Sequence, residues 1–130
     1  MHKIMVIDDN QEFLSLMEAW LQGEEFEVCL CADAQNAAKI AASERPSIIL
    51  LDLLMPSKPG IEVLAELKVD YSTRQIPVMV LTAASKQAKE TELQIKRLAD
   101  ELLPKPFDFE QLLSKLRHYL DESNNDRAIG

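Results

Sequence analysis

Short apolar runs alternate along this chain with longer segments in which apolar residues recur every three or four positions. The short runs predict five strands, most of which lack polar residues on either face. They lie at residues 3–7, 26–31, 48–51, 77–82 and 101–103. A strand that is apolar on both faces is typical of a parallel sheet with helices on both sides.

The segments between these runs predict five helices, because their apolar residues fall on one helical face. The helices are expected to begin near Asn10, Asp33, Gly60, Ser85 and Asp108. Asn10, Asp33 and Asp108 are residue types that cap helix N-termini, and Gln111 completes a pattern similar to a capping box. Gly23 is expected to end the first helix in the left-handed conformation. Five strands alternating with five helices predict an α/β domain with a mostly parallel sheet.

The length of 130 residues fits one domain with a hydrophobic core of its own. We expect this domain to occupy residues 1–120. Residues 121–130 are polar and are expected to be a C-terminal tail or a truncated linker.

The charge balance argues against two kinds of partner, nucleic acid and anionic membranes. Fourteen basic against 22 acidic residues give a net charge of −8, which disfavours binding to nucleic acid and to anionic membranes. The sequence has no apolar run long enough for a membrane span and no pattern of a signal peptide. Cys29 and Cys31 are expected to be reduced, buried thiols, so the expected location is cytoplasmic.

The central run, Ile48–Leu51, ends in a carboxylate, Asp52. Removing a charge from water costs several kcal/mol unless it is paired or bound to a metal. Asp52 is therefore expected to have partners or to lie at the mouth of a site.

The other strand ends supply such partners, since ligands of open parallel sheets bind outside the carboxyl ends of the strands. The polar residues at these ends are Asp8, Asp9, Asp52, Thr82 and Lys105. Three crowded carboxylates favour a divalent cation, and oxygen ligands favour Mg²⁺, or Mn²⁺, over zinc.

The first strand-to-helix turn, Asp8-Asp9-Asn10-Gln11, lacks the glycines of a nucleotide-binding loop, which argues against a dinucleotide site. Lys105 and Thr82 are instead suited to bind phosphoryl oxygens. Nucleophilic attack by Asp52 on a phosphoryl group would give an acyl phosphate.

Five motifs along residues 3–120 resemble the receiver domain of two-component response regulators. They are V-I-D-D-N at 6–10, L-L-D-L-L-M-P at 50–56, P-G-I-E-V-L at 59–64, V-L-T-A at 80–83 and P-K-P-F at 104–107. The resemblance implies a flavodoxin-like (βα)5 fold with strand order 2-1-3-4-5.

The same resemblance implies a role for each residue of the acidic site. Asp52 would be the phosphoacceptor. Asp9, Asp52 and the backbone carbonyl of Leu54 would ligate Mg²⁺, and Asp8 would act mostly through water.

The resemblance also implies how the phosphoryl group is held and detected. Thr82 would be the hydroxyl that moves to the phosphoryl group, and Lys105 would pair with one of its oxygens. The Lys105–Pro106 peptide bond is expected to be cis.

The implied partners follow from phosphotransfer. A sensor histidine kinase or a histidine phosphotransfer protein would supply the phosphoryl group. The helix at 85–98, the strand at 101–103 and the last helix would form the surface for an effector domain or for homodimerisation. The protein would be a single-domain shuttle, a phosphate sink or a receiver linked to an effector, and it would catalyse only its own phosphorylation and dephosphorylation.

The chain departs from the family pattern at five places. Leu102 replaces the aromatic residue three positions before the lysine, Leu98-Ala99 replaces a Gly-Ala pair, and Pro59 stands where Asp is frequent. Leu54 and Ala84 are apolar where many relatives are polar. Because apolar groups should hinder attack by water, we expect slow autodephosphorylation.

Two other functions are compatible with parts of this pattern. A Mg²⁺-dependent phosphohydrolase of the haloacid dehalogenase type would use Asp52 as nucleophile, but its second carboxylate would fall at Leu54. A degenerate receiver would be a constitutive interaction module, which the complete acidic site argues against.

Overall fold

One parallel sheet of five strands forms the centre of the protein in a computed structural model that describes residues 1–83 and 89–129. Its order, β2-β1-β3-β4-β5, confirms the flavodoxin-like order expected from the sequence. The strands are β1 (Lys3–Ile7), β2 (Glu27–Cys31), β3 (Ile48–Asp52), β4 (Val78–Thr82) and β5 (Glu101–Pro104).

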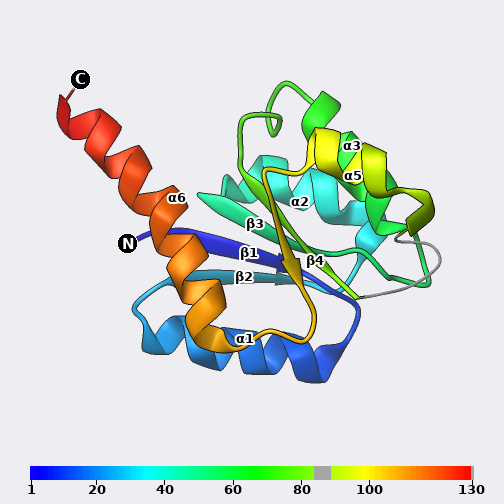
Figure 1. Cartoon of the computed structure of the whole chain (residues 1–130), viewed down its shortest axis with the longest axis horizontal. Coiled ribbons are helices and arrows are strands. Elements are labelled where there is room, and N and C mark those ends of the chain that lie inside the picture. The colour runs from blue at the N-terminus through cyan, green and yellow to red at the C-terminus, as the bar shows by residue number, and fades with distance from the viewer. Residues whose placement is uncertain (84–88, 130) are drawn as a thin grey trace.

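Helices cover both faces of the sheet (Figure 1). They are α1 (Gln11–Gly23), the short 3₁₀ helix η1 (Ala34–Asn36), α2 (Ala37–Glu44), α3 (Gly60–Val69), α5 (Glu92–Leu98) and α6 (Phe109–Ile129). Apolar residues of α1 and α6 pack on one face, and those of α2, α3 and α5 pack on the other. No helix of the described residues is both long and apolar enough to cross a membrane.

Alternating side chains of the central strand enter the two cores in turn. Ile49 and Leu51 pack with α2 and α3, whereas Ile48 and Leu50 pack with α1 and α6, and all four are 0% exposed. Burying one such side chain stabilises the fold by about 1.5–3 kcal/mol. The apolar run of β3 is therefore explained by burial on both faces, as its sequence predicted.

The expected left-handed end of α1 at Gly23 is wrong. Gly23 is the last helical residue, and the left-handed residue is Glu25, with φ 68°. The amide of Phe26 donates to the Leu21 carbonyl at 3.0 Å and that of Glu25 to Gln22 at 3.0 Å, which is the Schellman pattern. This arrangement turns the chain so that Phe26 packs against the core beneath α1.

The last helix begins as predicted but ends later. Asp108 Oδ1 accepts from the Gln111 amide at 2.8 Å, and Gln111 Oε1 accepts from the Asp108 amide at 3.0 Å. These reciprocal bonds confirm the capping box. The helix then continues past Leu120, where its apolar stripe ends, to Ile129, and it extends beyond the end of the sheet (Figure 1). Each added residue of an existing helix gains a backbone hydrogen bond, so a polar sequence can continue it.

The helix expected from Ser85 is described from residue 89, and its regular part is α5. The predicted start at Ser85 and the neighbouring Ala84 lie outside the described residues.

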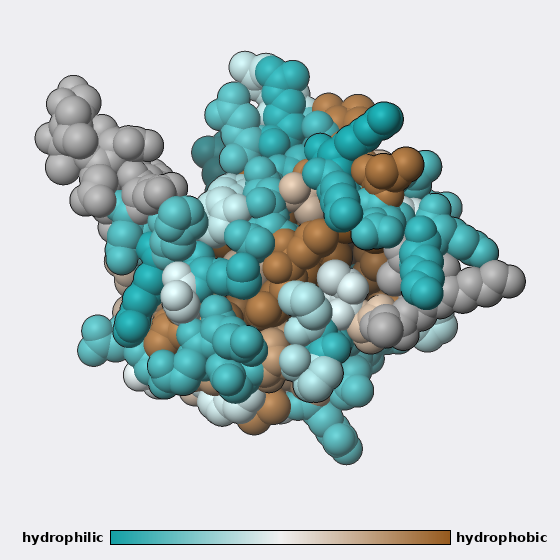
Figure 2. All heavy atoms as spheres, in the orientation of Figure 1, coloured by the Kyte–Doolittle hydropathy of each residue, from teal (hydrophilic) through white to brown (hydrophobic). Residues whose placement is uncertain are grey.

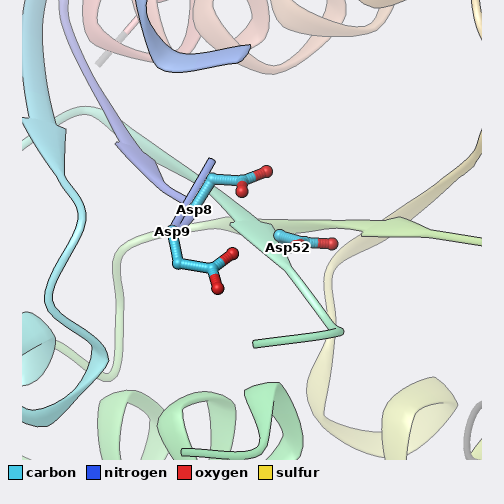
Figure 3. Close-up of side chains that lie close together, drawn as sticks. All are labelled: Asp8, Asp9 and Asp52. Carbon is cyan, nitrogen blue, oxygen red and sulfur yellow. The ribbon is translucent and has the colours of Figure 1, made fainter. Parts of the chain in front are cut away.

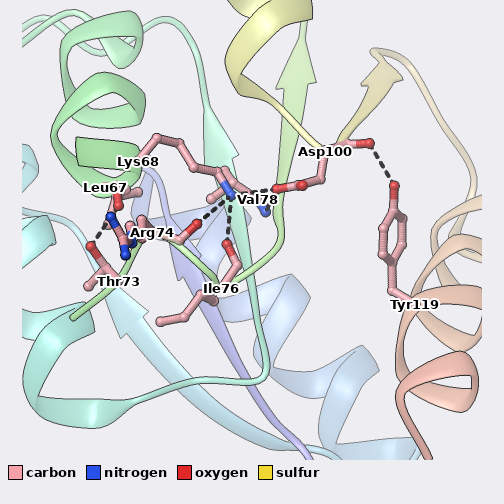
Figure 4. A network of polar contacts seen from close by, with 8 residues as sticks. All are labelled: Leu67, Lys68, Thr73, Arg74, Ile76, Val78, Asp100 and Tyr119. Atoms are coloured by element: carbon pink, nitrogen blue, oxygen red, sulfur yellow. Dashed lines mark hydrogen bonds and ion pairs between the residues drawn. The ribbon is translucent and has the colours of Figure 1, made fainter. Parts of the chain in front are cut away.

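A polar network ties the amino ends of β4 and β5 to two helices (Figure 4). Lys68 Nζ, on α3, donates to Asp100 Oδ2 at 2.6 Å and to the Ile76 carbonyl at 2.9 Å. The Val78 amide donates to the same Asp100 oxygen at 2.8 Å, and the Tyr119 hydroxyl of α6 donates to the Asp100 carbonyl at 2.6 Å. Asp100 thus joins α3, β4, β5 and α6 at the end of the sheet opposite the acidic residues.

We expect Asp100→Ala to lower the free energy of unfolding by about 1–2 kcal/mol. The Lys68 ammonium and the Val78 amide would both lose their carboxylate acceptor, and the loss is moderated because Asp100 is 39% exposed. Urea denaturation of both proteins would measure it.

Glu92→Ala is the control, since its ion pair with Lys96 lies on an exposed helix surface and should contribute about 0.3–0.5 kcal/mol. Equal losses from the two substitutions would contradict the structural role given to Asp100.

Candidate functional site

Three carboxylates meet at the carboxyl ends of β1 and β3 (Figure 3). These strands are adjacent, with Ile7 opposite Leu51, so Asp8 and Asp9 emerge beside Asp52. One carboxylate oxygen from each of the three residues lies within 4.8 Å of the others. The structure therefore brings together the acidic residues that the sequence singled out.

Burial changes the acidity of this cluster. Asp8 and Asp52 are 2% and 7% exposed, and Asp9 is more open to solvent. Desolvation raises the pKa of Asp8 to about 6, and the charges of Asp52 and Asp9 add to this rise. The amide of Asn10 and the ammonium of Lys105 oppose the increase. Asp8 consequently gains a proton more readily than an ordinary aspartate.

The turn after β1 fixes Asp8 and starts α1. The Asn10 amide donates to Asp8 Oδ1 at 2.9 Å, and Asn10 Oδ1 accepts from the Phe13 amide at 3.1 Å. The second bond is the predicted N-cap, whereas the first was not anticipated. One residue thus orients a site carboxylate and the first turn of a helix.

Lys105 enters the cluster from the loop after β5. Its Nζ lies 3.3 Å from Asp52 Oδ1 and 3.8 Å from Asp8 Oδ2. Its amide donates to the Thr82 carbonyl at 2.7 Å, and the Lys105–Pro106 peptide bond is cis, as expected. The ammonium offsets part of the negative charge that the fold concentrates here.

The remaining predicted site residues are Thr82, Leu54 and Leu102, which lie on β4, in the loop after β3 and on β5. Thr82 is the half-buried last residue of β4, one position beyond the residue paired with Asp52. The half-buried Leu54 directs its amide toward Asp52 Oδ1, 3.4 Å away. Leu102 is partly buried against the core formed with α2, α3 and α5. The expected roles of the Thr82 hydroxyl and Leu102 in switching, and of the Leu54 carbonyl as a metal ligand, stay predictions.

Gly60 shapes the loop after Asp52, a role that the sequence analysis missed. Its amide donates to the Leu53 carbonyl at 3.0 Å. A Cβ at this position would lie 2.6 Å from Leu53 Cα and 2.7 Å from the Asp52 carbonyl oxygen. No side chain fits there without moving the loop, so glycine allows α3 to begin directly against the site. The sequence feature that could have indicated this role is the glycine itself, because glycine is unfavourable in a helix and its presence at a helix start suggests a close backbone contact.

Two further contacts hold the outer part of this loop. Gln35 Nε2, on η1, donates to the Ser57 carbonyl at 3.0 Å, and Lys58 forms an ion pair with Glu66 of α3. The first contact joins segments 22 residues apart, the second ties the loop to the helix that follows it, and neither was predicted.

The donor set fits a hard divalent cation. Carboxylate and carbonyl oxygens are the ligands that Mg²⁺ prefers, and three carboxylates this close repel one another without a cation. Asp8, Asp9 and Asp52 could hold the ion, and Lys105 also forms an ion pair with Asp52.

Comparisons with known proteins agree with this geometry. The family model described as the response regulator receiver domain matches residues 4–117. The chain is 36% identical over 124 residues to the transcriptional regulatory protein CpxR of Klebsiella pneumoniae, covering 95% of this chain and 51% of that protein. It is also 36% identical over 115 residues to the response regulator PleD of Caulobacter vibrioides, covering 88% of this chain and 25% of that protein. The chain thus spans about half or less of these relatives.

Solved structures share the fold. The receiver domain of the sensor histidine kinase PA1611 from Pseudomonas aeruginosa, which holds a magnesium ion in its active site cleft, superposes with a TM-score of 0.81 at 26% identity. The chemotaxis protein CheY4 of Vibrio cholerae gives the same TM-score at 28% identity. Each comparison covers 92% of this chain and 98% of the other.

We expect Asp8→Asn to stabilise the metal-free protein at pH 7.5 by about 1–3 kcal/mol. The pKa of Asp8 is about 6 in the folded protein, against 3.8 ordinarily, so folding disfavours its ionised form. This penalty is complete above pH 6 and disappears as the pH falls toward 4. The stabilisation should therefore shrink across the same range, measured by urea denaturation in the presence of a chelator.

Asp9→Asn is the matched control because this carboxylate is more open to solvent. The interpretation fails if the gain from Asp8→Asn does not change with pH, or if Asp9→Asn reproduces it.

Proposed function

The chain belongs to the response regulator receiver domain family, and from this membership we propose that Asp52 accepts a phosphoryl group in a Mg²⁺-dependent reaction. The donor would be a sensor histidine kinase or a histidine phosphotransfer protein. The bond from phosphorus to the donor's histidine nitrogen breaks, and a bond from phosphorus to a carboxylate oxygen of Asp52 forms.

The observation that best supports this proposal is the surroundings of Asp52. Its carboxylate is 3.3 Å from the Lys105 ammonium and within 4.8 Å of Asp8 and Asp9 oxygens. Asp9, Asp52 and the Leu54 carbonyl would hold Mg²⁺, with Asp8 acting mainly through water. The ion would neutralise charge on the transferring group.

The chain's own residues have distinct tasks in this reaction. Asp52 attacks phosphorus, and Lys105 passes from a carboxylate oxygen of Asp52 to a phosphoryl oxygen. The Thr82 hydroxyl donates a hydrogen bond to another phosphoryl oxygen. Its strand position beside Asp52 supports this role, since Leu81 is the register partner of Asp52.

The output surface that we propose consists of α5, β5 and α6. Phosphorylation adds a charge of about −1.5 to −2, which favours the conformation that offers the most donors to the phosphoryl group. Thr82 belongs to β4, which pairs with β5, so its movement can reach that surface. β5 is an edge strand, and apolar surface is visible along it between the charged helices (Figure 2). An effector domain or a second receiver would bind there.

Turnover of external phosphoesters is the weaker alternative. A phosphohydrolase needs a carboxylic acid to protonate the leaving group, and the position two residues after Asp52 is Leu54. We therefore propose a signalling switch that catalyses only its own phosphorylation and dephosphorylation. We place it in the cytoplasm, where thiols such as Cys29 and Cys31, both free here, stay reduced.

Incubation with acetyl phosphate and Mg²⁺ tests the central proposal. We expect intact-protein mass spectrometry to show one added phosphoryl group on the wild type and none on Asp52→Asn. A chelator should abolish the modification, because the crowded carboxylates would then lack their cation.

Asp33→Asn is the matched control, since Asp33 caps η1 and is not one of the three carboxylates that could hold the ion. This variant should be phosphorylated at the wild-type rate. Modification that persists in Asp52→Asn would refute the assignment of the phosphoacceptor.

Slow hydrolysis of the phosphorylated protein is a separate prediction. Leu54 flanks Asp52 with an apolar side chain that cannot orient an attacking water molecule. Leu54→Asn should shorten the lifetime of the acyl phosphate several-fold, as followed by phosphate release after removal of the donor.

Val69→Asn, at an exposed position on α3, should leave the lifetime unchanged. A wild-type lifetime of seconds that Leu54→Asn does not alter would contradict this account.

A further inference from the structure

An aromatic ring from α1 faces the ammonium of Lys105. The Lys105 Nζ lies 4.8 Å from the centroid of the Phe13 ring. We propose that Phe13 is a positioning residue, whose ring holds this ammonium over Asp52 and Asp8 before the phosphoryl group arrives. The inference rests on the proposed function of Lys105 as a ligand of the phosphoryl group.

A second aromatic residue packs against the Phe13 ring. Phe13 and Phe107 pack edge to face, with centroids 6.5 Å apart and planes at 88°. Phe107 follows Lys105 by two residues, so the same loop supplies both the ammonium and the support of the ring. Such a pair restricts the orientation of the face that Phe13 presents to the cation.

The backbone of Phe13 is tied to the acidic cluster as well. Its amide donates to Asn10 Oδ1 at 3.1 Å, and the Asn10 amide donates to Asp8 Oδ1 at 2.9 Å. The turn that orients a carboxylate therefore also sets the position of the ring. The carboxylates and the aromatic face reach Lys105 from a common support.

The Phe13 ring can restrict Lys105 because the lysine side chain is long and partly exposed to solvent. The side chain is 28% exposed, and its distances to Asp52 and Asp8 are 3.3 and 3.8 Å. A lysine side chain has a flexible four-carbon stem, so the contacts with Asp52 and Asp8 alone define the position of the ammonium poorly. The negative face of a ring attracts an ammonium without accepting a hydrogen bond. All three donors of Lys105 consequently stay available for oxygen acceptors.

Phe13→Leu separates this attraction from simple packing. Leucine preserves an apolar side chain and favours helix, but it removes the ring quadrupole. The expected loss in affinity for beryllofluoride with Mg²⁺ is about two- to five-fold, the range of a partly exposed cation–π contact. Phe13→Tyr retains an aromatic face and should restore most of the affinity.

Titration of Mg²⁺ alone distinguishes positioning from structural damage. The ligands that could hold the ion are carboxylates, and Phe13 offers none, so the Mg²⁺ affinity of Phe13→Leu should equal that of the wild type. A double-mutant cycle adds a second criterion. In a Lys105→Ala background, Phe13→Leu should cause no further loss of beryllofluoride affinity, since the interaction partner is gone.

The proton resonances of the Lys105 Cε group in the metal-free protein report the contact directly. They should carry an upfield ring-current shift in the wild type and in Phe13→Tyr, and lose it in Phe13→Leu. This signal does not depend on phosphorylation. If it is present while the wild type binds no beryllofluoride, the proposed function fails and the ring contact stands.

Three results would overturn the inference itself. One is a missing ring-current shift in the wild type. The second is an equal fall in Mg²⁺ and beryllofluoride affinity in Phe13→Leu. The third is a full effect of Phe13→Leu in the Lys105→Ala background.

Discussion

Repulsion among three carboxylates at one end of the sheet is the constraint on which the rest of this structure depends. Asp8 and Asp52 are buried, and desolvation, together with the charges of Asp52 and Asp9, raises the pKa of Asp8 to about 6. Such a cluster is costly unless cations approach it. Lys105 supplies one positive charge from the protein. The carboxylate oxygens of Asp8, Asp9 and Asp52 are suited to bind a metal cation as a second one. The proposed binding of Mg²⁺ and of a phosphoryl group would offset the repulsion that Lys105 leaves uncompensated.

The strand that carries Asp52 is held by an apolar core on each of its faces. Both faces of β3 are buried, so Asp52 is fixed at the end of a strand that cannot shift without exposing its core residues. Gly60 lets α3 begin against the loop that follows, at a distance no side chain would permit. At the opposite end, Asp100 and Lys68 tie β4 and β5 to α3.

The proposed switch would have to use a different side chain from the aromatic residue that is usual in the family. Leu102 packs partly into the core with α2, α3 and α5, and it has no polar tip with which to mark an inward or outward state. Movement of Thr82 would then reach the surface through the pairing of β4 with β5 itself. Binding of the phosphoryl group would also involve α1, which is not part of the proposed output surface, since α1 contributes Phe13 to the surroundings of Lys105.

The sequence by itself determined the five strands, the helix caps at Asn10 and Asp108, and the set of polar residues at the strand ends, because these depend on local pattern and on parallel connectivity. The turn after α1 and the continuation of α6 to Ile129 differed, since glycine position and apolar periodicity do not fix where a helix stops. Only the tertiary structure decided the close approach at Gly60 and the ring of Phe13 over Lys105. Both depend on distances between segments far apart in the chain, which no local pattern specifies.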